Sequence, residues 1–384
     1  MSESTQAPDL LRGHTASVLC CAVHQSQAVL ASGSEDGDVA IHDLRSHEVA
    51  QRLNLGESGP VEVASAIFGV EDNQVFACSE ACVFQIDMRQ GAVLHRYAVN
   101  NDEINSLALS PNGTYLAAAD DTGAIKIVNV RTHQLHKSLT GCHSNICAAV
   151  SFRPHNPWEI LSCGLDAQLV RWNFATGRPV RRWQMGAELV QSDSTQAFNP
   201  PLAHSIDVAS PPWAPRQFGR LVAVARGDGH VALYDADHVD PGPKKGKKVK
   251  GKKGSGGASG CQDSATAEEA GRLREGQVCC LTQEDGGHSA SVGTVAFHQA
   301  SNGRHVVSGG NDAALLIWDW TSCVPDDSPW ARSMPEGSEA ASSTGYLHRI
   351  SHGRKVNAVA TCRGTGLNTF VADTSRTIKA YSIT

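Results

Sequence analysis

Two sets of residues combine the side-chain types of a charge-relay triad, a histidine, a serine and an aspartate. Each set also ends in a tryptophan, which follows the histidine by 29 residues in one set and by 30 in the other. An imidazole beside a hydroxyl and a carboxylate can activate a nucleophile. An active site would not recur along a chain, however, whereas buried polar groups always need partners. We therefore predict structural hydrogen-bonded clusters. The sets are His143, Ser162, Asp166 and Trp172, and His288, Ser308, Asp312 and Trp318.

Other motifs with catalytic or cofactor chemistry are missing from the sequence. It contains no G-x-x-x-x-G-K-[ST] phosphate loop, no G-x-S-x-G elbow and no H-E-x-x-H zinc helix. His133, His136 and Cys142 lie near His143 and offer metal-binding donor types, but they fall around an expected turn between strands. We predict no catalytic residue, no cofactor and no metal, and therefore a noncatalytic protein.

A repeated pattern organises nearly the whole chain. Each copy joins a short apolar strand, a small-residue turn and a strand of alternating polarity, and a further apolar strand precedes it. The copies are 29–45, 75–89 (the weakest), 115–131, 160–174, 221–237, 305–320 and 369–383. The turn residues Asp36, Glu80, Asp121 and Asp166 are separated by 44, 41 and 45 residues, which is the period of propeller blades. The pattern predicts an all-β fold with a single domain over residues 1–384.

Short motifs around these copies resemble the WD-repeat β-propeller family. Gly287-His288 precedes the sixth copy, and Trp318-Asp319 closes it. The resemblance implies a seven-bladed propeller in which His, Ser or Thr, turn Asp and Trp form a buried tetrad within a blade. The two complete sets match it. A third set contains His14, Ser32 and Asp36, with His42 in place of the tryptophan.

The end of the chain predicts how the ring closes. The last copy stops at its third strand, at Thr384. We predict that residues 6–12 supply the missing fourth strand and leave no open sheet edge. Four segments, ADDTGAIKI, HSNICAAVSFRP, LSCGLDAQLVRW and LAHSIDVAS, narrow the resemblance to one member of the family.

Two blade endings indicate a partner. Asp43-Leu44-Arg45 and Asp87-Met88-Arg89 close the first two copies. They resemble the W-D-x-R ending by which WD-repeat substrate receptors dock onto the adaptor of a cullin-RING ubiquitin ligase, although the tryptophan is missing. An exposed arginine can make bidentate contacts with a carboxylate. Arg89 is the preferred adaptor contact and Arg45 the second; the alternative is an arginine that pairs with a neighbouring loop or is simply solvated.

Three stretches interrupt the repeats and are rich in Gly, Pro, Ser and charge. They are residues 186–200, 238–276 and 323–346, and we expect loops without regular structure there. The second contains Lys244, Lys245, Lys247, Lys248, Lys250, Lys252 and Lys253. Without these seven lysines the net charge of −6 becomes −13. The run is interpreted as a solvated tail, a nuclear-localisation signal or a contact for nucleic acid or an acidic partner.

Composition narrows the function class. The net charge argues against a wholly basic nucleic-acid binder, and no apolar run approaches the length of a membrane span. The polar N-terminus favours an intracellular, cytoplasmic or nuclear protein. We predict a protein-interaction scaffold, monomeric within a complex, without specific nucleic-acid or membrane binding. It is either a ubiquitin-ligase substrate receptor or a general scaffold in another complex.

Overall fold

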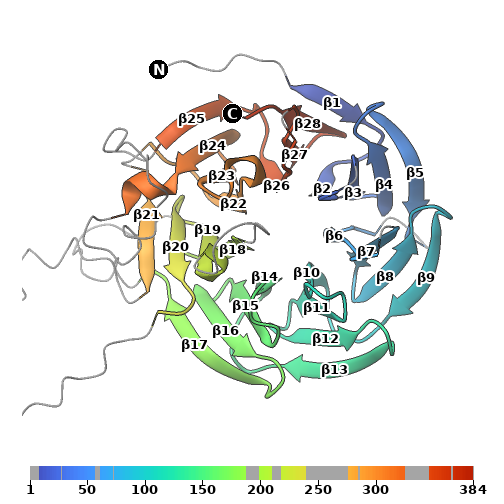
Figure 1. Cartoon of the computed structure of the whole chain (residues 1–384), viewed down its shortest axis with the longest axis horizontal. Coiled ribbons are helices and arrows are strands. Elements are labelled where there is room, and N and C mark those ends of the chain that lie inside the picture. The colour runs from blue at the N-terminus through green and yellow to red at the C-terminus, as the bar shows by residue number, and fades with distance from the viewer. Residues whose placement is uncertain are drawn as a thin grey trace, which may run out of the picture.

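Seven four-stranded antiparallel sheets form a closed ring (Figure 1). The computed structural model describes residues 8–26, 28–56, 61–71, 73–186, 199–209, 218–238, 276–283, 286–324, 346–364 and 366–383. The chain is therefore an all-β, seven-bladed propeller, as the repeat period and the family resemblance predicted. Within the described ranges, no helix has the length and apolar character needed to cross a membrane.

Six of the seven blades consist of four strands that are consecutive in sequence, and in every blade the strand nearest the ring axis is the first of its repeat (Figure 1). Blades one and two contain β2 Val18–Val23, β3 Val29–Ser34, β4 Asp38–Asp43 and β5 Glu48–Asn54, then β6 Ser65–Phe68, β7 Gln74–Ser79, β8 Cys82–Asp87 and β9 Ala92–Tyr97. Blades three and four contain β10 Ile104–Leu109, β11 Tyr115–Asp120, β12 Ile125–Asn129 and β13 Gln134–Leu139, then β14 Cys147–Phe152, β15 Glu159–Gly164, β16 Gln168–Asn173 and β17 Arg178–Gln184.

The remaining blades follow the same order. Blades five and six contain β18 Ala203–Val208, β19 Leu221–Arg226, β20 Val231–Asp235 and β21 Gln277–Leu281, then β22 Val292–Phe297, β23 His305–Gly310, β24 Ala314–Asp319 and β25 Tyr346–Ser351. Blade seven contains β26 Val356–Thr361, β27 Thr369–Asp373, β28 Thr377–Tyr381 and the N-terminal β1 Asp9–Arg12. Short 3-10 helices occur at η2 Phe218–Arg220, η4 Gln299–Ser301 and η5 Trp320–Cys323.

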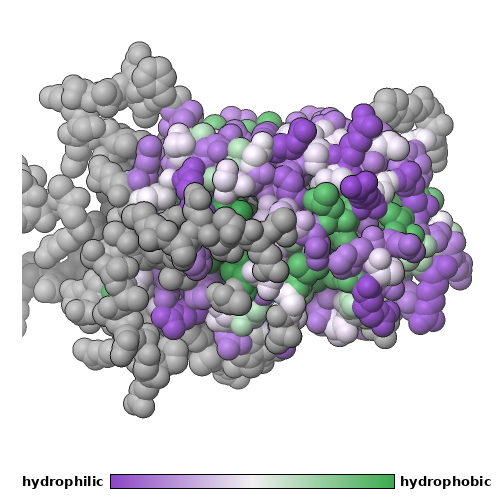
Figure 2. All heavy atoms as spheres, turned by 90° about the horizontal axis from the view of Figure 1, so that it is seen from above, coloured by the Kyte–Doolittle hydropathy of each residue, from purple (hydrophilic) through white to green (hydrophobic). Residues whose placement is uncertain are grey.

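The hydrophobic core lies between the blades. Every buried cluster joins two neighbouring blades; Trp318 of β24, for example, packs with Leu221 and Leu233 of blade five. Middle strands such as β24 are buried along their whole length because blades cover both of their faces, whereas the outer β5 alternates between exposed and half-buried residues. Seen from its rim, the ring presents mostly hydrophilic side chains with separate hydrophobic patches (Figure 2).

The N-terminal strand closes the ring. β1 pairs antiparallel with β28, and Leu11 lies opposite Ile378. Both side chains are fully buried. The predicted closing strand is thus confirmed, and in the structure it begins at Asp9.

The predicted turn residues join the second and third strands of their blades, but Glu80 lies in a tighter turn than its counterparts. Ser79 pairs directly with Cys82, so two residues complete this turn, and Glu80 adopts a left-handed conformation with φ 49°. The longer turns leave room for an aspartate to reach back towards the blade. Blade two therefore lacks the local geometry of a tetrad at this position.

The three predicted insertions fall mostly outside the described residues. Only the ends of 186–200, 238–276 and 323–346 are described, and all seven lysines of residues 244–253 lie outside these ranges. The predictions made for these segments stay predictions.

Candidate functional site

The predicted tetrads of blades four and six are assembled as complete hydrogen-bonded sets. In blade four, His143 Nε2 lies 2.7 Å from Ser162 Oγ, and Trp172 Nε1 donates to the same oxygen at 2.8 Å. His143 Nδ1 lies 3.1 Å from both carboxylate oxygens of Asp166. The four side chains connect the segment before the blade to its second strand, its third strand and the turn between them.

Blade six repeats this geometry. His288 Nε2 and Trp318 Nε1 both lie 2.9 Å from Ser308 Oγ, and His288 Nδ1 lies 2.9 Å from Asp312 Oδ1. Burial raises the pKa of Asp312, but the hydrogen bond and charge of His288 outweigh it, with help from Arg349, and lower that pKa to about 2.

Because they are buried, these tetrads cannot perform the nucleophilic catalysis that their residue types suggest. Ser162 and Ser308 are fully buried, and the tryptophans cover them at 1% exposure or less. A nucleophile must reach a substrate carbonyl, which neither hydroxyl can do here. Their geometry fits a structural role that holds each blade together.

Blade one departs from this arrangement. His14 Nε2 lies 2.6 Å from Ser32 Oγ, and the same oxygen lies 3.0 Å from His42 Nε2. Asp36 bonds to Ser34 Oγ at 2.5 Å and to the Thr15 hydroxyl. No hydrogen bond joins His14 to Asp36 among the described residues, and His14 Nδ1 is buried without a partner there. The sequence thus predicted the His–Ser pair correctly, but the expected contact to the turn aspartate is not made.

Blade seven contains a different polar set that was not predicted from the sequence. His352 Nε2 lies 2.8 Å from Asp373 Oδ2, and His352 Nδ1 lies 2.8 Å from the hydroxyl of Tyr381. Asp373 occupies the last position of its second strand, as Asp120 does in blade three, where it accepts a hydrogen bond from Asn100 at 2.9 Å. In both copies, an aspartate at the end of the second strand is the sequence feature that could have predicted such a polar set.

The two candidate docking endings form equivalent turns between third and fourth strands. His47 N donates to Asp43 O and Gly91 N donates to Asp87 O, each at 2.9 Å. His47 and Gly91 both adopt φ 60°. This left-handed conformation ends each turn and directs the chain into the fourth strand. The two arginines therefore occupy matching positions on the same side of neighbouring blades.

The aspartate of each ending accepts a backbone hydrogen bond within its own turn. Asp43 Oδ1 accepts a hydrogen bond from Arg45 N at 2.8 Å, and Asp87 Oδ1 accepts one from Arg89 N at 2.7 Å. Asn129 does the same for Arg131 N at 3.0 Å in blade three. The carboxylates thus fix the turns and direct the arginines outward.

The arginine side chains are accessible to a partner. The Arg45 side chain is 79% exposed, with its Nε 3.4 Å from Asp43 Oδ1. The Arg89 side chain is exposed and forms no hydrogen bond or ion pair with the described residues. Of the four residues predicted to contact an adaptor, the two arginines have the exposure that such a contact needs.

A hollow lies beside the first of these turns, between blades seven and one. It has a volume of about 380 Å³, and its lining includes Val23, Leu44, Cys362, Leu367 and Phe370. Gln25, Ser26 and Arg363 also line it, and Leu44 directly precedes Arg45, so a partly apolar recess and an exposed guanidinium occur together. Aromatic or aliphatic anchors in such recesses, flanked by arginines, are typical of protein–protein contacts.

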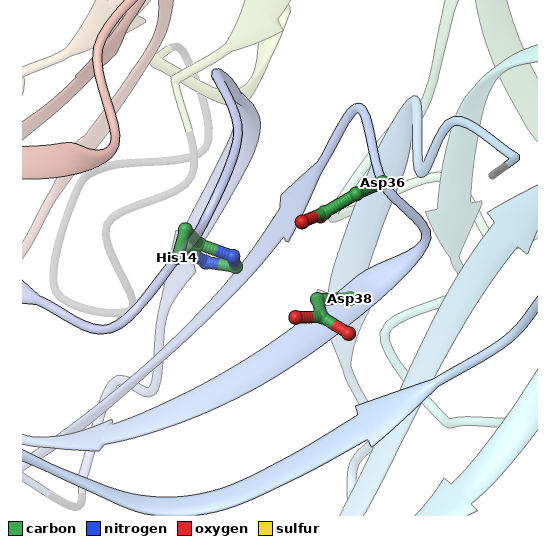
Figure 3. Close-up of side chains that lie close together, drawn as sticks. All are labelled: His14, Asp36 and Asp38. Atoms are coloured by element: carbon green, nitrogen blue, oxygen red, sulfur yellow. The ribbon is translucent and has the colours of Figure 1, made fainter.

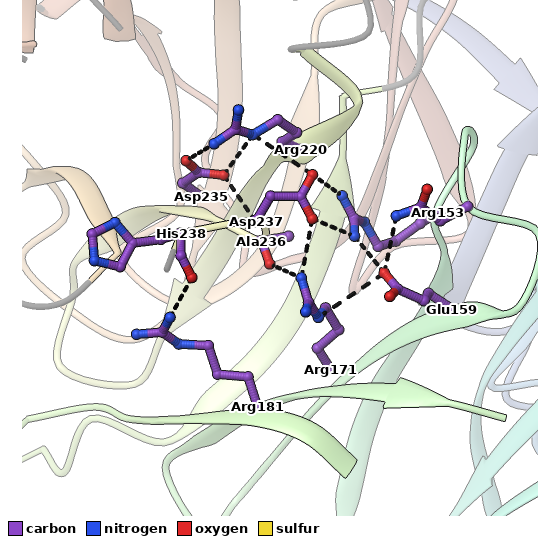
Figure 4. A network of polar contacts seen from close by, with 10 residues as sticks. Arg153, Glu159, Arg171, Arg181, Arg220, Asp235, Ala236, Asp237 and His238 are labelled. Carbon is purple, nitrogen blue, oxygen red and sulfur yellow. Dashed lines mark hydrogen bonds and ion pairs between the residues drawn. The ribbon is translucent and has the colours of Figure 1, made fainter. Parts of the chain in front are cut away.

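An arginine-rich clasp fixes blade four to blade five (Figure 4). Arg153, whose side chain is 3% exposed, donates bidentate hydrogen bonds of 2.8 Å to Asp237 and also pairs with Glu159. Arg171 donates to Asp237 at 3.0 Å and to the carbonyl of Ala236. The long-range partners of these arginines could not be identified from local sequence patterns.

The clasp lies at the base of the lysine-rich insertion. Arg220 Nε donates to Asp235 at 2.9 Å, and Arg181 donates to the carbonyl of His238. Asp235 N in turn donates to Gly276 O at 2.7 Å, across the two ends of residues 239–275. His238 and Gly276, which flank that segment, lie between a third and a fourth strand, on the side of the ring that holds Arg45 and Arg89.

Comparisons with known proteins agree with this architecture. The family described as "WD domain, G-beta repeat" matches residues 6–43, 91–129 and 278–319. A WD repeat-containing protein 53 homolog from Dictyostelium discoideum is 24% identical, over 97% of this chain and 93% of its own length.

More distant similarities cover less of the other proteins. WD repeat-containing protein 37 from Xenopus laevis is 23% identical over 45% of this chain and 35% of its own length. A periodic tryptophan protein 2 homolog from Dictyostelium discoideum is 24% identical over 80% of this chain and 29% of its own length. The member indicated by the four sequence segments was WD repeat-containing protein 53, which agrees with the similarity that spans nearly the whole chain. The chain is a seven-bladed β-propeller in which three segments match the WD-repeat family model, and WD-repeat propellers are generally scaffolds for protein interactions.

Proposed function

We propose that this propeller is a substrate receptor of a cullin-RING ubiquitin ligase and docks onto the ligase adaptor through Arg45 and Arg89. The observation that carries the proposal is the pair of matching turns on blades one and two. Each turn fixes its backbone with an aspartate and presents an exposed arginine. Two guanidinium groups on one side of a rigid ring suit bidentate contacts with carboxylates of a partner.

The rigid scaffold supports this role. Partner-binding residues commonly lie on loops that a stable framework positions. The hollow beside Leu44 adds a partly apolar recess next to Arg45. In this proposal the arginine-bearing side meets the adaptor, while another surface of the ring holds the substrate.

Affinity purification with mass spectrometry tests the proposal. We expect the unmutated chain to recover the adaptor and the double variant Arg45→Ala/Arg89→Ala to lose it, by at least tenfold, because truncating a central interface arginine typically costs 2 kcal/mol or more. Arg131→Ala is the matched control, since Arg131 follows an equivalent turn capped by Asn129. Asp87→Asn should keep binding because an amide oxygen can accept the same backbone hydrogen bond.

Two results would contradict the docking proposal. One is failure of the unmutated chain to recover any adaptor. The other is equal recovery by the unmutated chain and the double variant. Both results favour the alternative, a general WD-repeat scaffold in a different complex.

A second proposal concerns residues 244–253, whose seven lysines serve as a nuclear import signal or contact an acidic partner. The supporting observation is the concentration of positive charge in a chain that is otherwise acidic. Imaging of a variant that lacks residues 244–253 tests import. We expect its nuclear fraction to fall, and an unchanged fraction removes the import role.

A further inference from the structure

Blade one carries two carboxylates where blades four and six carry one. A ring nitrogen of His14 and one carboxylate oxygen each from Asp36 and Asp38 all lie within 4.8 Å of one another (Figure 3). Asp38 begins the third strand of its blade, where blades four and six have Gln168 and Ala314. The other tetrads therefore serve as internal references for what is different here.

Hydrogen bonding in the reference blades assigns the histidine proton. The indole of Trp172 can only donate, so Ser162 Oγ accepts from it and its own proton is available to His143 Nε2. His143 then carries its proton on Nδ1 and donates it to Asp166. The same logic applies to blade six.

In blade one, His42 allows the hydrogen bonds between histidine and serine to have the opposite donor–acceptor direction. Its Nε2, 3.0 Å from Ser32 Oγ, can accept the serine proton, and Ser32 Oγ also lies 3.5 Å from Ala40 O. His14 Nε2 can then donate to Ser32 Oγ across 2.6 Å. This arrangement leaves a lone pair on His14 Nδ1, in an imidazole that lies beside two carboxylates.

The surroundings of His14 agree with this assignment. The residue is 7% exposed, and its Nδ1 is buried with no hydrogen-bond partner among the described residues. Burial lowers the pKa of His14 to about 4, with a smaller lowering effect from Arg52, so the imidazole is neutral at pH 7. A buried lone pair beside two negative groups is unfavourable unless a cation joins them.

We propose that His14, Asp36 and Asp38 form a binding site for a divalent transition-metal cation, with Zn²⁺ as the best-suited ion. A neutral imidazole is a common ligand of zinc, copper, iron and nickel, and zinc also accepts carboxylate oxygens. The hydrogen bond from His14 Nε2 to Ser32 would orient the ring, as second-shell partners of metal-bound histidines do. These three residues belong to none of the metal-site motifs considered in the sequence, from which we predicted no metal.

Binding requires local rearrangement. Ligands of a tetrahedral zinc at about 2.0–2.2 Å lie about 3.4 Å from one another, so the three side chains must draw together. Asp38 is also 3.5 Å from Arg52 Nε and accepts a hydrogen bond from Asn54 at 2.8 Å. The cation therefore competes with Arg52 for Asp38.

The position of the site suggests a structural effect. Only Gly13 separates His14 from β1, the strand that closes the ring. A bound cation would tie this segment to the turn between β3 and β4. It would therefore stabilise the closed ring, by an amount that rises with free metal concentration.

Zinc titration of the purified full chain tests the proposal, by isothermal calorimetry after treatment with a chelator. We expect the unmutated chain to bind one more equivalent of Zn²⁺ than Asp38→Asn does. His42→Trp should also lose this equivalent, because an indole donor restores the proton order of the other blades. Arg52→Gln should bind at least threefold more tightly, since a competing cation is removed. Glu35→Gln, which removes a carboxylate from the same turn, is the matched control and should bind like the unmutated chain.

The comparison of zinc stoichiometry between the variants decides whether the site exists. Circular dichroism confirms that each variant is folded, and Asp38→Asn alone suffices if His42→Trp does not fold. X-ray absorption at the zinc edge should show nitrogen and oxygen ligands. Equal zinc stoichiometry in the unmutated chain and Asp38→Asn overturns the site, as does a zinc edge with sulfur ligands only. Binding of Ca²⁺ with equal affinity overturns the assignment to a transition metal.

Discussion

Leu11 of β1 lies directly opposite Ile378 of β28, so residues near the two ends of the chain share one blade. Both side chains are buried in the cluster between blades seven and one. Closure therefore depends on apolar packing as well as on strand pairing. A ring without this strand would expose the edge of β28 to solvent and to other chains.

The first prediction concerns this closing strand. Leu11→Ala should lower the free energy of unfolding by about 2–5 kcal/mol, the usual cost of truncating a buried leucine. Leu10→Ala in the same strand should change it by about 0.5 kcal/mol or less, because Leu10 is 41% exposed. Deletion of residues 1–12 should destabilise the protein more than Leu11→Ala does. Denaturant unfolding of the three variants provides the measurement, and a deletion that unfolds like the full chain would show that closure is unimportant.

The second prediction concerns the tetrad of blade six. Ser308→Ala removes the oxygen that both His288 and Trp318 contact, so it should cost about 2–4 kcal/mol. Trp318→Phe should also lower the free energy of unfolding. The part of this loss that comes from the hydrogen bond to Ser308 should largely disappear when Ser308 is already replaced by alanine. Thermal or chemical denaturation of both single variants and the double variant measures this coupling. Ser151→Ala on a half-buried strand position is the control, and strictly additive effects would argue against a shared network.

The repeat pattern predicted the ring, and the reason is physical. Alternation of polarity and the recurring turns are local features, and each blade must repeat them to bury its faces against its neighbours. Complete tetrads were predictable for the same reason: His143 and Ser162 belong to one blade and keep a fixed spacing. The pairing of residues 6–12 with the last copy followed from counting strands.

Contacts between blades could not be predicted in this way. Arg153 and Asp237 belong to different blades, and no spacing rule links them. Ser34, Thr15 and His14 were all possible hydrogen-bond partners of Asp36, and only the three-dimensional arrangement shows that Ser34 and Thr15 bind its carboxylate. Sequence spacing identifies which groups can meet within a blade, whereas side-chain direction decides which of them do.

The third prediction concerns the clasp between blades four and five. Asp237→Ala leaves the buried guanidinium of Arg153 with Glu159 as its remaining acidic contact. Because hydrogen bonds to charged groups are stronger than average, we expect a loss of roughly 2–3 kcal/mol. Asp102→Ala, at an exposed position, should cost about 0.5 kcal/mol or less. Chemical denaturation measures both, and hydrogen exchange should show faster opening at β20 in Asp237→Ala only; equal effects of the two variants would contradict the clasp.

The fourth prediction concerns pH and the two histidines of blade one. Burial lowers the pKa of both His14 and His42 to about 4, from an ordinary value of 6.5. Between pH 6.5 and 4 the unfolded chain therefore binds more protons than the folded chain at these positions. Stability from this source is fully present above pH 6.5 and is lost as the pH falls, by about 2 kcal/mol for each histidine at pH 5.

His42→Trp removes one of these two titrating imidazoles. An indole does not titrate, so the loss of unfolding free energy between pH 7 and pH 5 should be smaller in the variant by about 2 kcal/mol. The comparison is made by urea denaturation in the presence of a chelator, so that metal binding does not contribute. Asp312, whose pKa is about 2 beside His288, is ionised throughout this range and should not alter the difference. Parallel pH profiles for the two proteins would show that the buried histidines do not govern acid sensitivity in this range.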